Sequence, residues 1–261
     1  MIQIFKFSLL VLSCNFVSQV VYAQSINEVN NALKAINGSI QLEVRKYEGT
    51  NPIEKFFVAQ NSPQFTVANW NMQLSAKPVT NHPEAMDVTA NFKLTEGTAS
   101  STAVSVSFNF SKWSRDNYVM VPAIVYNGNR YHSIGDGYNP AYTKDMYYNP
   151  KVPLTISNNP RMAIEKGKAS VVELQTGNAA TPAMCFYSAA DKKGFIVLTG
   201  QRSKWGNHGM TIAENAAQDS CSFSLSVPAM RNLAPGFGDF HKSGDKAPDW
   251  KAGDEVNLKF R

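Results

Sequence analysis

The stretch from Tyr118 to Tyr148 carries the residue types best suited to chemistry in this chain. It begins as an apolar run, breaks at Asn127-Gly128, and continues with tyrosines, amides, carboxylates and the guanidinium of Arg130. Planar aromatic rings can cover the C–H face of a sugar, while amides and charged groups hydrogen-bond its hydroxyls. The residue types therefore predict a carbohydrate as the class of partner, and they name no reaction.

Arg130 has two alternative roles in this stretch. A guanidinium beside a rigid turn can bind the carboxylate of an acidic sugar, such as a uronic acid, or it can form a structural salt bridge. Trp205 and His208 form a second polar-aromatic cluster, which either lines the same cleft or packs in a turn. The predicted sugar-binding residues are Asn127, Asn129, Arg130, Tyr131, Tyr138, Tyr142, Trp205 and His208.

The turn at Asn127-Gly128 and the loop that follows it also have structural alternatives. Asn-Gly after an alternating strand is typical of a hairpin turn. The loop at Gly135–Tyr148 is long for a connection, and long ordered loops are often functional. Its tyrosines either contact a sugar or a neighbouring domain, or they pack onto the sheet as a small core.

The carboxylates and histidines predict no catalytic centre. Hydrolysis of a glycosidic bond needs two carboxyl groups that flank the bond, and the spacing of Asp116, Asp136, Asp145 and Glu165 pairs none of them. The four histidines lack the spacing of metal ligands, and no nucleophile elbow, phosphate loop or dinucleotide motif is present. We therefore expect no catalytic residue, no metal ion and no cofactor, and whether the chain is an enzyme stays open.

The N-terminus predicts export. Residues 1–23 combine a positive flank at Lys6, a short apolar stretch and the small-residue cleavage pattern Val21-Tyr22-Ala23, as in a secretory signal peptide. We expect a mature chain that starts at Gln24 and lies in the periplasm or outside the cell. The alternative is a lipoprotein, because Leu12-Ser13-Cys14 is a fragment of a lipid-attachment box. No later stretch is long and apolar enough to predict a membrane helix.

Charge and cysteine content narrow the partner classes. The chain has 261 residues and a formal net charge of +5, and its basic residues are scattered rather than grouped. This distribution is typical of an ordinary protein surface and does not predict a nucleic-acid partner. In an oxidising compartment Cys185 and Cys221 either pair as a disulfide or remain two buried thiols, because each lies in an apolar run.

The elements that must position these residues are almost all β-strands. Ile26, Val29, Leu33 and Ile36 have helical spacing before Asn37-Gly38, which predicts one short N-terminal helix. Apolar and polar residues then alternate with period two, so we expect a large antiparallel two-sheet β-sandwich over residues 24–261. The expected strands lie near residues 40–44, 65–74, 88–94, 104–110, 119–126, 169–175, 183–188, 194–199, 221–227 and 255–260.

Three segments resemble a known family. YVMVPAIVYNGNRYHSIG, NPRMAIEKGKASVVELQTGNAATPAMCFYS and GDEVNLKFR are similar to the N-terminal β-domain of certain secreted bacterial glycoside hydrolases. In such proteins a galactose-mutarotase-like β-supersandwich precedes an (α/α) toroid that carries the catalytic acids. The resemblance covers most of the mature chain and places Asn127, Asn129 and Arg130 at a polar turn near the cleft between domains. It implies a glycan partner and a C-terminal helical domain, which this sequence lacks.

Two functional hypotheses follow. The first is a non-catalytic β-sandwich that braces a catalytic toroid in a glycan-degrading enzyme and contributes sugar contacts. It agrees with the end of the sequence, because the chain stops at Arg261 directly after a predicted strand, as the front part of a longer protein would. The alternative is a free-standing carbohydrate-binding or structural cell-envelope protein, in which that last strand closes the sandwich.

Overall fold

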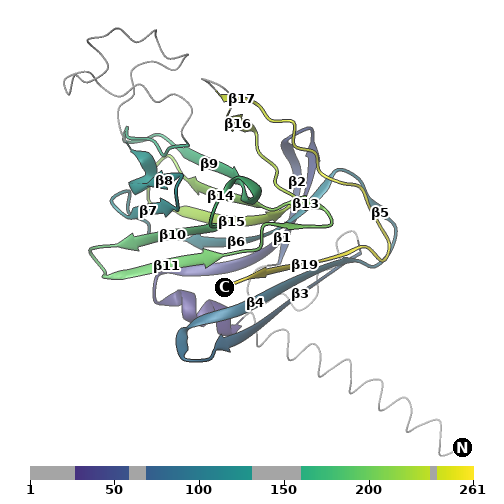
Figure 1. The fold of residues 1–261 in the computed structure, drawn as a ribbon, viewed down its shortest axis with the longest axis horizontal. Coiled ribbons are helices and arrows are strands. Elements are labelled where there is room, and N and C mark those ends of the chain that lie inside the picture. Colours follow the sequence, from purple (N-terminus) through teal and green to yellow (C-terminus); the bar gives the residue numbers. More distant parts are fainter. Residues whose placement is uncertain (1–26, 59–68, 131–159, 236–239) are drawn as a thin grey trace, which may run out of the picture.

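The computed structural model describes residues 27–58, 69–130, 160–235 and 240–261. These residues form an all-β sandwich of antiparallel sheets with one short helix, residues 27–34, near the N-terminus (Figure 1). The predicted fold class is thereby confirmed. Within these ranges, no helix has the length and apolar character needed to cross a membrane.

One layer of the sandwich is a six-stranded antiparallel sheet. Alternation is strict in its centre, where Val104, Val106 and Phe108 are buried in the core while Ser105 and Ser107 lie on the opposite face. The sheet order is β2 (Asn51–Val58), β1 (Gly38–Glu48), β6 (Thr102–Phe110), β15 (Cys221–Val227), β14 (Gly209–Glu214) and β9 (Ser170–Gln175).

The second layer consists of two sheets that meet at one edge. A bridge between Thr199 and Phe260, with reciprocal backbone hydrogen bonds of 2.9 Å between Leu198 and Arg261, joins them. The four-stranded sheet has the order β11 (Lys193–Leu198), β10 (Ala183–Ser188), β7 (Tyr118–Val121) and β8 (Val125–Tyr126). The three-stranded sheet has the order β19 (Glu255–Phe260), β4 (His82–Leu94) and β3 (Trp70–Val79).

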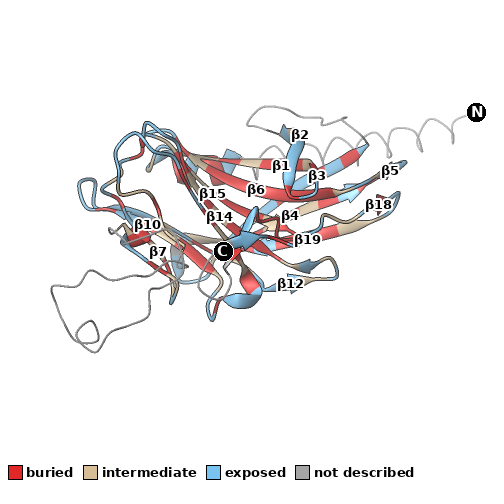
Figure 2. Cartoon of the chain, turned by 90° about the horizontal axis from the view of Figure 1, so that it is seen from above, coloured by how far each residue is buried: buried red, intermediate tan, exposed pale blue. Residues whose placement is uncertain are grey.

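Aromatic side chains fill the space between the layers. The ring of Phe108 on β6 packs against Phe195 on β11 and Phe260 on β19, with centroids 4.9 and 5.6 Å away. Phe110 and Phe186 meet edge to face at 4.8 Å. Burying each ring contributes roughly 1.5–3 kcal/mol, so this cluster holds the layers together. Figure 2 shows the buried residues between the sheets.

Short hairpins and bridges complete the sandwich. One of them brings Trp250 against Trp70 and Trp205, with ring centroids 4.9 and 4.1 Å away. The short pairs are β5 (Thr98–Ala99) with β18 (Trp250–Lys251), β12 (Arg202–Ser203) with β13 (Gly206–Asn207), and β16 (Leu233–Pro235) with β17 (Phe240–Lys242).

The predicted strand over residues 119–126 needs a correction. The chain instead forms two strands, β7 and β8, which pair through the turn Pro122–Ile124. Pro122 cannot donate a ladder hydrogen bond, and Ala123 has a left-handed φ of 65°, so an uninterrupted strand cannot form. The hairpin turn therefore lies before Asn127-Gly128, and residues Asn127–Asn129 form a separate 3-10 turn, η1.

Candidate functional site

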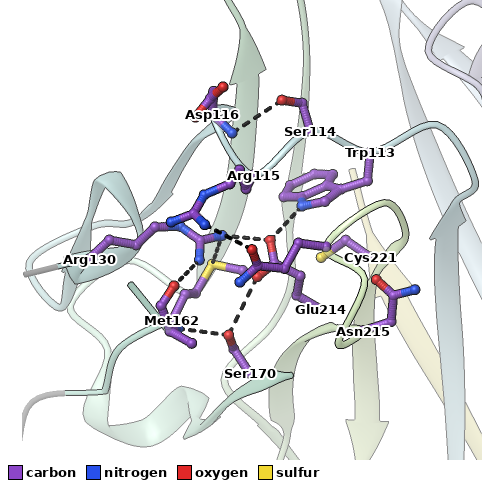
Figure 3. Close-up of polar contacts among 12 residues, drawn as sticks. Trp113, Ser114, Arg115, Asp116, Arg130, Met162, Ser170, Glu214, Asn215 and Cys221 are labelled. Carbon is purple, nitrogen blue, oxygen red and sulfur yellow. Dashed lines mark hydrogen bonds and ion pairs between the residues drawn. The ribbon is translucent and has the colours of Figure 1, made fainter. Parts of the chain in front are cut away.

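Arg130 belongs to a buried polar cluster centred on Glu214. Its Nη2 lies 2.5 Å from Glu214 Oε1, and its Nη1 donates to the carbonyl of Ala163. The same carboxylate accepts hydrogen bonds from Trp113 Nε1 at 2.7 Å and from Ser170 Oγ at 3.4 Å (Figure 3). The Glu214 side chain is 0% exposed and that of Arg130 is 9% exposed. Of the two roles open for Arg130, the structure shows the salt bridge.

The side chain of Asn129, like that of Arg130, is engaged by other groups of the protein. Its Nδ2 donates to the carbonyls of Ile124 and Pro160 at 2.9 and 2.8 Å, and its Oδ1 accepts from the Tyr126 amide at 2.9 Å. An amide side chain offers two donors and two acceptor lone pairs, and three of these four positions are used here. Asn129 therefore fastens the start of the segment after residue 159 to the η1 turn.

The η1 turn is tight because three successive residues have left-handed φ. The angles are 49° at Asn127, 68° at Gly128 and 49° at Asn129, a conformation that glycine and asparagine tolerate best. A Cβ atom at position 128 would lie 3.2 Å from Met162 Sδ and 3.3 Å from Arg130 Cγ. The sequence Asn-Gly-Asn thus allows Met162 and Arg130 to close over the turn, and only the Asn127 side chain remains exposed.

Trp205 and His208 flank β13 and contact different groups from those around Arg130. The Trp205 ring stacks on Trp250, and its indole N–H donates to the Glu255 carbonyl at 3.3 Å. The Lys204 ammonium lies 4.7 Å from the Trp205 ring centroid. The tryptophan is half-buried, as expected for a packed turn residue.

His208 is a buried histidine, and neither of its ring nitrogens makes a hydrogen bond of ordinary geometry within the described part of the chain. It is 4% exposed, and its backbone accepts a hydrogen bond from the Thr176 amide and donates one to the Gln201 carbonyl. Burial lowers the pKa of His208, and the nearby Gly200 backbone offsets this shift only in part. The remaining predicted sugar contacts, Tyr131, Tyr138 and Tyr142, lie outside the described residues.

A second group of residues lies on the outer face of the four-stranded sheet. Tyr118 on β7 is directly opposite Tyr187 on β10, and Met120 on β7 is opposite Tyr126 on β8. The three tyrosines are 42%, 47% and 55% exposed, in the order 118, 187, 126. We call this surface the tyrosine face, formed by Tyr118, Met120, Tyr126, Cys185, Tyr187, Ile196 and Leu198.

The backbone beneath the tyrosine face holds its rings in place. The Tyr126 hydroxyl accepts a hydrogen bond of 3.0 Å from the Ala123 amide. The Tyr187 ring lies next to Gly194, since a Cβ atom there would be 3.6 Å from ring carbon Cδ2. On the opposite side of the sheet Val119 and Phe186 are buried in the core. The rings are thus presented by a rigid, packed element rather than by a loop.

The sequence indicated only part of the tyrosine face. Tyr118 and Tyr126 fall in the stretch singled out from the sequence, whereas Tyr187 and Ile196 were not identified. The signal that could have found them is the period-two alternation of β10 and β11, which turns Tyr187 and Ile196 away from the buried Phe186 and Val197. When several large apolar residues occupy the outward positions of neighbouring antiparallel strands, they form an exposed patch of the kind that binds a ligand or another protein.

The cysteines and the metal-binding residue types provide no further site. Cys185 and Cys221 are free thiols, so the disulfide alternative is not realised. Burial raises the pKa of Cys221, the nearby Glu214 carboxylate adds to this shift, and burial also raises the pKa of the half-buried Cys185. Across the described ranges, no three or more histidine, cysteine, aspartate or glutamate side chains are grouped to hold a metal ion.

Comparison with known proteins gave no relative. No protein-family model matches the chain, and neither the curated proteins nor the solved structures contain a match to it. Functional inference therefore depends on the geometry of the tyrosine face and of its surroundings.

Proposed function

We propose that this chain is a non-catalytic β-sandwich domain that binds carbohydrate through the tyrosine face. The observation that carries the proposal is the group of Tyr118, Tyr187 and Tyr126 on one face of one packed sheet, each about half exposed. Tyrosine combines a flat apolar ring with a hydroxyl, so it can stack on the C–H face of a sugar and hydrogen-bond the edge.

The chemistry around the rings suits adsorption rather than turnover. Met120 and Cys185 are paired neighbours beside the tyrosines, and neither a carboxylate nor a histidine occurs among the members of the tyrosine face. Glycosidic hydrolysis needs two carboxyl groups at the bond. The strongest carboxylate–guanidinium pair near this stretch, Glu214 with Arg130, is sealed in the interior and engaged by protein groups.

The resemblance noted in the sequence suggests the setting of such a domain. In a secreted bacterial glycoside hydrolase, such a β-sandwich would precede an (α/α) toroid. The sandwich would brace the toroid and hold the polysaccharide close to it. The predicted signal peptide at residues 1–23 agrees with work outside the cytoplasm. N-terminal sequencing of the exported protein should then begin at Gln24, whereas a lipid-modified Cys14 would favour the lipoprotein alternative.

Affinity electrophoresis on a panel of soluble polysaccharides tests the proposal. We expect retardation of the chain on at least one glycan, and loss of that retardation in a Tyr118→Ala/Tyr187→Ala variant. Ile53→Ala/Phe57→Ala is a matched control, because these two side chains are similarly exposed on edge strand β2. Retardation that persists in the tyrosine variant, or that is absent on every glycan, would refute the proposal. The same samples should release no reducing sugar.

A further inference from the structure

The side chains of the tyrosine face are ordered by the pairing of the strands beneath them. Tyr187 on β10 lies directly opposite Tyr118 on β7. Two residues further along β7, Met120 lies opposite Tyr126 on β8. Because β7 is the strand between β10 and β8, Tyr187 and Tyr126 mark the two ends of a diagonal across the sheet, and Tyr118 lies between them.

This diagonal is longer than one sugar ring. Neighbouring strands are ~4.8 Å apart and two residues of a strand span ~6.8 Å, so the Cα atoms of Tyr187 and Tyr126 are separated by ~12 Å. The Cα atoms of Tyr118 and Tyr187 are only ~5 Å apart, so these two rings contact the same part of a ligand. The tyrosine face therefore has one sugar subsite at the pair Tyr118–Tyr187 and a second subsite at Tyr126.

Two contacts hold the rings at the ends of the diagonal along the sheet. The Tyr187 ring leans over Gly194 on β11, where an added Cβ atom would lie 3.6 Å from its Cδ2. The Tyr126 ring folds back to the preceding turn, because its hydroxyl accepts a hydrogen bond from the Ala123 amide. Both ends of the diagonal thus present an exposed aromatic ring whose position is set by the protein.

The tyrosine face has no charge to offer a ligand. None of its residues is charged, and three cations that flank its strands in the sequence are engaged elsewhere. Lys193 donates to the Ala35 carbonyl, Arg115 donates to a backbone carbonyl, and Arg130 is paired with Glu214. A sugar carboxylate on this face would lose part of its hydration without gaining a cation, which disfavours acidic glycans.

We infer that the tyrosine face selects a single extended chain of uncharged, equatorially linked sugars, such as a β-1,4-glycan, which crosses β10, β7 and β8 from Tyr187 to Tyr126. The inference rests on the proposed function and adds the substrate class. Equatorial linkages keep successive rings in line, so a C–H face can reach each subsite, whereas axial linkages curve the chain away. Neighbouring strands are twisted by ~20–25°, so a flexible single chain follows this surface better than a flat crystalline polysaccharide does.

Isothermal titration of the full chain with oligosaccharides of defined length tests this assignment. The ligands are β-1,4-linked gluco-, manno- and xylo-oligosaccharides from the disaccharide to the hexasaccharide. In at least one series we expect the affinity to rise about tenfold with length, as the ring of Tyr126 becomes covered. At equal length, axially linked α-1,4-gluco-oligosaccharides and acidic β-1,4-mannuronate oligomers should bind about fivefold more weakly or worse.

Variants of Tyr126 separate the two subsites. Tyr126→Ala should reduce the affinity for long oligomers to that for the disaccharide, and the disaccharide itself should bind as before. Tyr126→Phe retains the ring and should retain the dependence on length. Val171→Ala is the matched control, because Val171 is similarly exposed but lies on β9 in the other layer. If Tyr126→Ala does not fold, the length and linkage series of the unaltered chain still decides the matter.

The outcomes distinguish failure of this inference from failure of the proposed function. The inference would be overturned by affinity that is independent of length, by an equal loss for short and long oligomers in Tyr126→Ala, or by tighter binding of the axially linked or acidic oligomers. Binding to none of these oligomers, together with retardation on another polysaccharide, would also overturn it. The proposed function stands in each of these cases. Absence of binding to every glycan would overturn both.

Discussion

The tyrosine face and the Glu214 cluster both take residues from positions 113–130, but the side chains of the first are exposed and those of the second are buried. Tyr118 and Tyr126 turn outward from β7 and β8, and each is about half exposed. Trp113 and Arg130, a few residues before and after them, turn inward and converge on a carboxylate that has no contact with solvent. In the first region the polar and aromatic groups remain open to a ligand, and in the second the protein itself uses them.

This difference teaches that residue type alone does not identify a binding site. An arginine, an asparagine and a tryptophan near a turn are also the residues that fasten a buried carboxylate. What separates the two regions is the direction of the side chain relative to the sheet, together with the number of partners the protein supplies. The two regions should therefore respond differently to mutation, one through stability and the other through binding.

The largest expected effect comes from breaking the buried pair. Arg130→Met leaves Glu214 buried without its guanidinium, which should lower the free energy of unfolding by about 3–5 kcal/mol. Urea unfolding followed by tryptophan fluorescence measures the loss. Arg261→Met is the control, because Arg261 forms an exposed pair with Asp87 and its removal should change the midpoint little. An unchanged midpoint for Arg130→Met would show that the cluster does not stabilise the fold.

The second effect falls on binding rather than on stability. Tyr118→Ala/Tyr187→Ala removes the two opposed rings and should weaken glycan affinity about tenfold or more, equivalent to ~1.4 kcal/mol. Their rings are about half exposed, so the unfolding midpoint should move far less than for Arg130→Met. Titration and urea unfolding of the same samples separate the two effects. A variant that unfolds early and still binds would reverse the assignment of the two regions.

His208 sharpens the comparison because it is buried like Glu214, yet within the described residues its ring nitrogens make no hydrogen bond of ordinary geometry. Its folded-state pKa is lowered, so the unfolded state binds the proton more readily, and stability falls as the pH drops below about 6.5. That loss continues until the pH reaches the lower folded-state pKa. Urea-unfolding midpoints at about pH 7, 6 and 5, which bracket the ordinary histidine pKa of about 6.5, measure this loss of stability. In His208→Leu the decline should be smaller, whereas His241→Leu, at an exposed position, should leave it as it is.

The smallest effect concerns the thiol beside the cluster. Cys221 is buried next to Glu214, and both its burial and the carboxylate raise its pKa, so little thiolate forms at neutral pH. Iodoacetamide should leave Cys221 unlabelled in the folded protein and should modify it after unfolding, as mass spectrometry of peptides can show. Rapid labelling in the folded state would mean that the cluster is open to solvent.

The fold followed from the sequence because period-two alternation survives wherever one face of a strand is buried. The patterns at Val104–Phe110 and Glu255–Phe260 predicted β6 and β19. The edge strand β2 was not predicted, because its sequence has no comparable alternation and contains Pro52. The strand β14 was not predicted either, because it is only six residues long and begins with a glycine.

The site was harder to predict because its residues come together only through strand pairing. Tyr118 and Tyr187 are neighbours across β7 and β10, and nothing in the local sequence around either residue specifies that register. Conversely, Arg130 looked like a ligand contact because its partner Glu214 lies 84 positions away in the chain. The ion-pair alternative could be stated from the sequence, but its partner could not be named.

The most direct test of this division is an NMR titration of the chain with the oligosaccharide that binds best. Chemical-shift changes should concentrate on the ring signals of Tyr118, Tyr126 and Tyr187, while the Trp113 indole N–H, which is bonded to Glu214 at 2.7 Å, should remain unmoved. Shifts that centre on Trp113 and Arg130, with the tyrosine rings unaffected, would contradict the account.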